Sequence, residues 1–204
     1  MVVEIHQSYG SIDVYGGSGD DQLTGSVSTY ADDLNGEDGD DWLDGLGGPD
    51  YLNGGDGDDG LVYDSSDITI DGDAGIDTLL VSGSIDLSGV NNIADIEVIS
   101  MRDNGTSDAL TVNTADLFNF VGDNSLEPLL NNGMENMIIT GDEGDTVTLN
   151  GQLLEMNGQL SNGLTSDYTE MDYFDDGELY VRFTDSNGLD VYVHSDLLEP
   201  PPAA

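Results

Sequence analysis

Cysteine is absent from this chain of 204 residues, so no disulfide can stabilise its fold and no thiol can serve as nucleophile or metal ligand. Lysine is absent as well, and Arg102 and Arg182 are the only arginines. They stand against 43 Asp and Glu residues, which give a formal net charge of −41. Such a surface repels phosphate, so we expect no nucleic-acid partner and no attraction to anionic membranes.

Long apolar runs are missing too. No stretch approaches the length that crosses a bilayer, so membrane insertion is not expected. The first ten residues, MVVEIHQSYG, lack the basic and apolar regions of a Sec signal.

Catalytic motifs are equally scarce. His6 and His194 are far apart in sequence, whereas zinc sites use His or Cys at short spacing, and we interpret both as surface residues. No H-E-x-x-H, G-x-S-x-G or Walker loop occurs. We therefore predict that the chain is not an enzyme.

What the chain does have is a nine-residue period. The fragments GGSGDDQLT, GEDGDDWLD, GLGGPDYLN, GGDGDDGLV and GDAGIDTLL share leading glycines, Asp at position six and an aliphatic residue at position eight. One step, from Leu23 to Leu34, is two residues longer than the others. The eighth positions are Val14, Leu23, Leu34, Leu43, Leu52, Leu61, Ile70 and Leu79.

This period predicts stacked coils. Glycine-rich positions one to six suit a turn, and the last three suit a short strand with its middle side chain inward. Two repeats then form one coil, and coils stack at roughly 4.8 Å. We predict an all-β fold with a short right-handed parallel β-roll over residues 16–80. So acidic a composition is also typical of disorder, but the apolar period favours folding that depends on cations.

The coils divide the repeats into two rows. The first row consists of the four repeats that begin at Gly16, Gly36, Gly54 and Gly72, and its sixth positions are Asp21, Asp41, Asp59 and Asp77. In the second row only Asp32 and Asp50 fill the sixth position, and Ile12 and Ile68 occupy it at the two ends. We therefore expect the first row to hold more metal.

The nonapeptide G-G-x-G-x-D-x-U-x resembles the calcium-binding repeat of RTX (repeats-in-toxin) proteins. The resemblance implies that carbonyls at positions one, three and five join the sixth-position carboxylates around Ca²⁺, which takes six to eight oxygens. Those residues are Gly16, Ser18, Asp20, Gly36, Asp38, Asp40, Gly54, Asp56, Asp58, Gly72, Ala74 and Ile76. Three gaps in the first row and one between Asp32 and Asp50 imply about three to five ions.

Two other interpretations of these acidic turns fit the sequence less well. Solvated Asp-Gly turns are common, but five repeats in register argue against that interpretation. The run from Asp56 to Gly60 begins like an EF-hand loop, yet its twelfth position is Asp67 rather than Glu.

Outside the roll, residues 1–15 are expected to form an N-terminal capping coil and 81–150 a β-rich capping or continuation region. Strands are predicted at Ile96–Met101, Ala109–Val112 and Met137–Thr140, with a short helix at Thr114–Phe120. Residues 151–204 are expected to contain a hairpin of Glu178–Asp185 and Leu189–His194, turning at Asn187 and Gly188, before an extended end at 199–204.

Function follows from the resemblance. RTX blocks usually stand near the C-terminus of proteins that leave Gram-negative bacteria by type I secretion, and Gly89–Ile99 with the final hairpin looks like the end of a long RTX adhesin. The resemblance implies that the chain is the monomeric, calcium-binding C-terminal region of a secreted adhesin, located at the cell surface or outside the cell. Its partners would be calcium, the type I secretion machinery, which reads a signal in 151–204, and upstream adhesin modules.

Alternatives remain from other classes. An accessory module of a polysaccharide-modifying RTX enzyme should carry basic residues to grip a polyanion, and two Arg argue against it. A carbohydrate- or ice-binding module should show a regular file of Thr or aromatics, but position seven includes Gln22, Asp33, Trp42, Tyr51 and Gly60. A calcium-rigidified spacer would need a longer roll.

Overall fold

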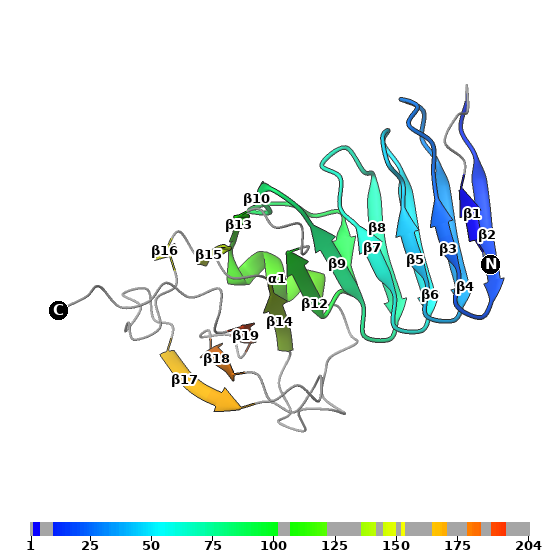
Figure 1. Cartoon of the computed structure of the whole chain (residues 1–204). Coiled ribbons are helices and arrows are strands. Elements are labelled where there is room, and N and C mark those ends of the chain that lie inside the picture. The colour runs from blue at the N-terminus through cyan, green and yellow to red at the C-terminus, as the bar shows by residue number, and fades with distance from the viewer. Residues whose placement is uncertain are drawn as a thin grey trace. The chain divides into compact units, whose positions relative to one another are not determined.

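The computed structural model of the chain describes residues 2–4, 10–101, 107–121, 136–141, 145–149, 152–153, 165–170, 179–184 and 189–194. The fold is all-β, as predicted, with parallel pairing dominant among its strands (Figure 1). Contacts divide the chain into two compact units. The first comprises Met1–Leu80, Asn91–Glu97 and Gly122–Asn124, and the second Val81–Val90, Val98–Val121 and Ser125–Ala204.

The first unit is a roll of two parallel sheets whose coils follow one another from blue to green in Figure 1. Within this unit, one sheet includes β1 (Val2–Glu4), β3 (Gln22–Thr24), β5 (Trp42–Asp44), β7 (Gly60–Val62) and β9 (Thr78–Val81). The other consists of β2 (Asp13–Ser18), β4 (Asp33–Asp38), β6 (Tyr51–Asp56), β8 (Thr69–Ala74) and β11 (Ile93–Ala94). From β2 to β9, successive strands alternate between the two sheets.

The eighth-position aliphatics form the core of this roll. Leu34 pairs with Leu52 in one sheet, and Leu43 pairs with Leu61 in the other. All eight predicted core residues are buried, from 7% exposed at Val14 to 0–1% at the others. Strands repeat every eighteen residues (34 to 52) except in the first coil, where the insertion makes the step twenty (14 to 34), and at the end, where β11 follows β8 by 23 (70 to 93).

Strand lengths differ from the prediction on one side of the roll. Strands β3, β5 and β7 have the expected three residues, but β2, β4, β6 and β8 have six. The longer strands include positions one to three of each first-row repeat, which were predicted to turn. Ladder pairs such as Ser18 with Asp38 hold these positions extended, so the first-row turn shrinks to positions four to six.

The second unit also contains two sheets. In one, β10 (Ser84–Asp86), β13 (Ala109–Val112) and β15 (Thr146–Leu149) run parallel, and β16 (Gln152–Leu153) is antiparallel to β15. In the other, β12 (Val98–Met101), β14 (Asn136–Thr140) and β19 (Asp190–His194) run parallel. β18 (Leu179–Thr184) pairs antiparallel with β19 and with β17 (Thr165–Glu170).

Two local predictions for this unit are confirmed. Helix α1 (Thr114–Phe120) begins after an extended Asn113 and buries Leu117 and Phe120. Strands β18 and β19 form the antiparallel hairpin, whereas its Asn187-Gly188 turn, the end at 199–204 and His6 lie outside the described residues. Within the described ranges, no helix is both long and apolar enough to span a membrane.

Candidate metal centre

The sixth-position Asp residues of the first row stack and are joined by hydrogen bonds between coils. The amide of Asp21 donates to Oδ1 of Asp41 at 2.7 Å, and the amide of Asp41 donates to Oδ1 of Asp59 at 2.7 Å. The amide of Asp59 donates to Oδ1 of Asp77 at 2.8 Å. All four are buried. One oxygen of each later carboxylate is therefore occupied by the coil before it.

Glu97 continues this series by one further coil. Its Oε2 accepts a hydrogen bond from the amide of Asp77 at 2.9 Å, and its side chain is fully buried. The nine-residue period missed this residue because the segment around it lacks the glycine frame of the repeats. We call Asp21, Asp41, Asp59, Asp77 and Glu97 the carboxylate ladder.

The second oxygen of each ladder carboxylate is the atom that could bind a cation. Oδ2 of Asp41, Asp59 and Asp77 and Oε1 of Glu97 are buried and accept no hydrogen bond. A buried carboxylate oxygen without a partner is costly, roughly 1–3 kcal/mol or more for a charged group. A file of such oxygens fits bound cations, because a cation would satisfy and neutralise them together.

Burial also shifts the acidity of these groups. Desolvation raises the pKa of Asp59 to about 6, with the charge of Asp41 contributing. Desolvation raises the pKa of Asp77 to about 7 and that of Glu97 to about 8; the charge of Asp59 adds to the rise at Asp77, and the charge of Asp77 adds to the rise at Glu97. Without a cation, Asp77 and Glu97 therefore resist ionisation near neutral pH.

Position-one glycines leave room for these carboxylates. A Cβ on Gly36 would collide with Oδ2 of Asp41 and with the carbonyl oxygen of Gly54. A Cβ on Gly54 would likewise lie 2.7 Å from the carbonyl oxygen of Gly72, beside Oδ2 of Asp59. The structure thus brings the sixth-position carboxylate beside the position-one carbonyl of the next coil, as the calcium hypothesis requires. In the first turn, a Cβ on Gly16 would meet the carbonyl oxygen of Gly36 at 2.5 Å and Oδ2 of Asp21 at 2.8 Å.

The position-three carbonyls accept backbone hydrogen bonds from the preceding coil. The amides of Gly19, Gly39 and Gly57 donate to the carbonyl oxygens of Asp38, Asp56 and Ala74 at 2.6, 2.8 and 2.9 Å. Each carbonyl oxygen keeps a second lone pair that could still face a cation. Ser18, the position-three residue of the first turn, is exposed at the end of β2.

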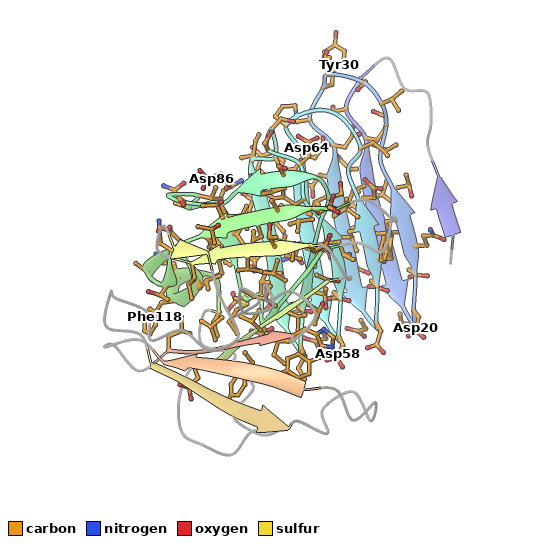
Figure 2. All side chains as sticks on the ribbon, turned by 60° about the vertical axis from the view of Figure 1, so that its left-hand side comes forward. Asp20, Tyr30, Asp58, Asp64, Asp86 and Phe118 are labelled. Atoms are coloured by element: carbon orange, nitrogen blue, oxygen red, sulfur yellow. The ribbon has the colours of Figure 1, made fainter. Side chains whose placement is uncertain are left out.

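Position five carries an outer file of carboxylates. Asp20, Asp40 and Asp58 are exposed, and each accepts a hydrogen bond from the position-five amide of the next coil, at 3.3, 3.0 and 2.9 Å. Figure 2 shows Asp20 and Asp58 at one edge of the roll, with Tyr30 and Asp64 at the opposite edge. The position-five carboxylates lie in solvent, so the buried sixth-position carboxylates form the better cation site.

The second row differs because the protein itself satisfies most of its carboxylates. Oδ1 of Asp32 accepts from the amide of Ile12 at 3.0 Å, and its Oδ2 accepts from the amide of Ser26 at 2.8 Å. Oδ1 of Asp50 accepts from the amide of Asp32 at 2.8 Å, while its Oδ2 is buried without a partner. Burial raises the pKa of Asp50.

The end of the second row corrects the nine-residue register. Asp67, rather than Ile68, occupies the place of the sixth-position residue: its Oδ1 accepts from the amide of Asp50 at 3.4 Å and its Oδ2 from the amide of Asp64 at 3.0 Å. Ile68 is 41% exposed. The Asp64 turn is one residue shorter than the register requires, and Asp67 would have been found by searching for Asp within one residue of position six.

One similar pair lies in the second unit. The amide of Asp108 donates to Oδ1 of Asp145 at 2.7 Å, just before strands β13 and β15. This hydrogen bond repeats the geometry of the ladder.

Across the part of the chain that the structure describes, no three or more His, Cys, Asp or Glu side chains gather in a group that could hold a metal ion. Any cation on the ladder would therefore need backbone carbonyls as well as carboxylates. No protein-family model, curated protein or solved structure matches the chain.

Proposed function

We propose that this chain is the calcium-binding RTX C-terminal region of a secreted bacterial adhesin, unfolded during type I secretion and folded by extracellular calcium. The observation that carries the proposal is the file of buried carboxylate oxygens without hydrogen-bond partners on Asp41, Asp59, Asp77 and Glu97. Its donor set consists of oxygens alone, which suits a hard cation such as Ca²⁺.

Charge explains why folding should await the cation. Residues 1–101 contain no Lys or Arg, so the roll has no cationic side chain apart from His6 to offset its carboxylates. Stacking the coils brings ionised groups of like sign out of water and next to each other. Bound calcium would supply the missing positive charge, and its binding energy would then be folding energy.

The two rows should differ in their ion content. The first row offers successive gaps along Asp21, Asp41, Asp59 and Asp77, whereas the second offers one unsatisfied carboxylate, Asp50. Hydrogen bonds within the protein occupy both oxygens of Asp32 and both of Asp67. We expect about three to five ions, most of them in the first row.

Calcium affinity sets where the switch operates. Extracellular calcium modules bind at about 10⁻⁴–10⁻³ M, so such sites stay empty in the cytosol and fill outside the cell. The chain would be unfolded during export and would fold on arrival at the cell surface, attached to the upstream modules of its own polypeptide.

The decisive experiment is far-UV circular dichroism of the full chain in EDTA and in millimolar calcium. At pH 8 we expect strand signal only with calcium. A spectrum in EDTA identical to that in calcium would exclude the folding switch.

Export has its own test. A passenger fused upstream of the whole chain should be secreted by a type I system, and deletion of 151–204 should abolish secretion. Because β17, β18 and β19 lie in that segment, the deletion is compared with a chain whose folding is weakened by substitution of Asp59. Secretion of the deletion variant would place the signal elsewhere.

A further inference from the structure

Glu97, the last residue of the carboxylate ladder, is hydrogen-bonded differently from the four Asp residues. In the regular coils, the amide of the residue after the ladder Asp donates to the preceding coil: Trp42 to the carbonyl of Asp21 at 2.9 Å, and Gly60 to that of Asp41 at 2.8 Å. At the end of the row, the amide of Glu97 itself donates to the carbonyl of Asp77 at 3.1 Å. Glu97 thus stands one position later along the strand than the Asp residues do.

The longer side chain of Glu97 compensates for that shift. With one more methylene than Asp, its carboxylate reaches back to the amide of Asp77, at 2.9 Å. Asp77 and Glu97 are therefore joined by two hydrogen bonds, one from each amide. Aspartate at 97, one methylene shorter, would not reach the amide of Asp77.

The turn that leads to Glu97 is also shortened, since Glu97 follows Ile93 by four residues whereas Asp77 follows Ile70 by seven. Strand β11 pairs Ile93 with Ile70 and Ala94 with Asp71, so Asp95 comes alongside Gly72. Asp95 has a left-handed backbone, with φ of 49°. A Cβ on Gly72 would meet Oδ2 of Asp77 at 2.5 Å and would collide with the carbonyl oxygen of Asp95. A carboxylate and a carbonyl oxygen thus lie together beside Gly72, as they do in the regular repeats.

We propose that Oδ2 of Asp77, Oε1 of Glu97 and the carbonyl oxygen of Asp95 hold one further hard divalent cation, calcium, beyond the last nonapeptide repeat. This site rests on the proposed calcium-binding function of the ladder. Glu97 is its added ligand, and the site closes the first row at its C-terminal end.

Burial and charge carry this inference. Asp77 and Glu97 are both 0% exposed, and one oxygen of each is buried without a hydrogen-bond partner. Two adjacent buried carboxylates need a positive counter-charge, and residues 1–101 contain no Lys or Arg to provide it.

The competing role for Glu97 is a purely structural cap that holds a proton instead of a cation. The variant E97Q separates the two roles, because the amide oxygen of Gln can still accept from Asp77 while the charge is lost. Exposed Glu37 provides the matched control E37Q.

The experiment is native mass spectrometry of the full chain at saturating calcium, with the calcium dependence of urea unfolding as a second count of ions. We expect E97Q to bind one ion fewer than the parent, with a linkage slope lower by about one, and E37Q to match the parent. An equal ion count in E97Q and the parent would overturn the site while leaving the proposed function intact. Failure of the parent to bind any calcium would overturn the proposed function itself, and this site with it.

Folding of E97Q gives an independent readout. Loss of one ion should raise the calcium midpoint for folding several-fold yet leave the variant folded at about 20 mM calcium, well above the usual 10⁻⁴–10⁻³ M range. A variant that stays unfolded there, while E37Q folds, would show that Glu97 is a structural cap and would overturn the site.

Discussion

The backbone amide of Asp59 donates a hydrogen bond of 2.8 Å to Oδ1 of Asp77 in the next coil, while Oδ2 of Asp77 accepts none. One half of each ladder carboxylate thus serves to stack the coils, and the other half is left for a ligand. Because each carboxylate depends on the coil before it, the ladder forms only when the coils stack together. Coil stacking and cation binding should therefore be one cooperative event.

Replacing Asp59 should weaken the calcium-bound fold selectively. D59N keeps an oxygen that can accept from the amide of Asp41 but removes the charge. Each lost ion costs about 2.7 kcal/mol when calcium is 100-fold above its Kd. We expect D59N to lower the free energy of unfolding in calcium by about that amount per ion, as measured by urea titration, and D41N to behave alike.

The control for this prediction is D32N. Both oxygens of Asp32 are hydrogen-bonded to the amides of Ile12 and Ser26, so D32N loses an acceptor and not an ion. Its cost should be about 1–3 kcal/mol and should not depend on calcium concentration. Equal calcium dependence in D59N and D32N would contradict the difference between the two rows.

Without calcium, the roll should become more stable as the solution is acidified. The folded-state pKa values of Asp59, Asp77 and Glu97, about 6, 7 and 8, exceed the ordinary values of 3.8 and 4.5. The folded form therefore binds more protons than the unfolded form between about pH 4 and 8, and its stability is lost as pH rises through that window.

This pH effect is measured by circular dichroism in EDTA from pH 8 to pH 5. The folded fraction should rise as pH falls. In calcium at limiting concentration the trend should reverse, since protons compete with the cation for the same oxygens. An EDTA profile in which folding improves with rising pH would contradict the burial of unneutralised carboxylates.

The apolar period of the sequence was sufficient to predict the core and the stacking of the first unit. Leu34, Leu52 and Ile70 recur at a fixed spacing, and a coil can bury them only by placing them above one another. The larger number of sixth-position Asp residues in the first row could also be predicted, because these residues can be counted in the sequence without a structure.

The departures from the period could not be predicted in the same way. Asp67 lies one residue out of register because the turn before it is short, and Glu97 reaches the amide of Asp77 through a longer side chain after a shortened turn. Both depend on how a turn closes in space, which spacing alone does not encode. The extension of β4 through Gly36, Glu37 and Asp38 likewise results from pairing with adjacent coils.

Glycine at position one should be required for steric reasons. In Gly36→Ala the new methyl would collide with Oδ2 of Asp41 and the carbonyl oxygen of Gly54, which belong to rigid parts of two coils. We expect a loss of about 1–3 kcal/mol in calcium, typical of overpacking. Gly10→Ala, where a Cβ would meet nothing within 4 Å, should change the urea midpoint little. Similar losses in both variants would show that glycine acts there through chain flexibility alone.

Truncation to Ala should cost far more stability at Ile70, in strand β8, than at Ile68, just before it. Ile70 is 0% exposed and pairs with Leu52 and Ile93 on either side, whereas Ile68 is 41% exposed. Ile70→Ala should cost about 2–5 kcal/mol, because it opens a cavity in a core that is one residue wide per strand. In a stacked array each coil is supported only by its neighbours, so this cavity should also raise the calcium concentration needed for folding. Ile68→Ala should leave the calcium midpoint measured by circular dichroism nearly unchanged. Equal shifts in the two variants would mean that calcium alone holds the coils together, since the aliphatic stack would then contribute nothing that the ladder does not.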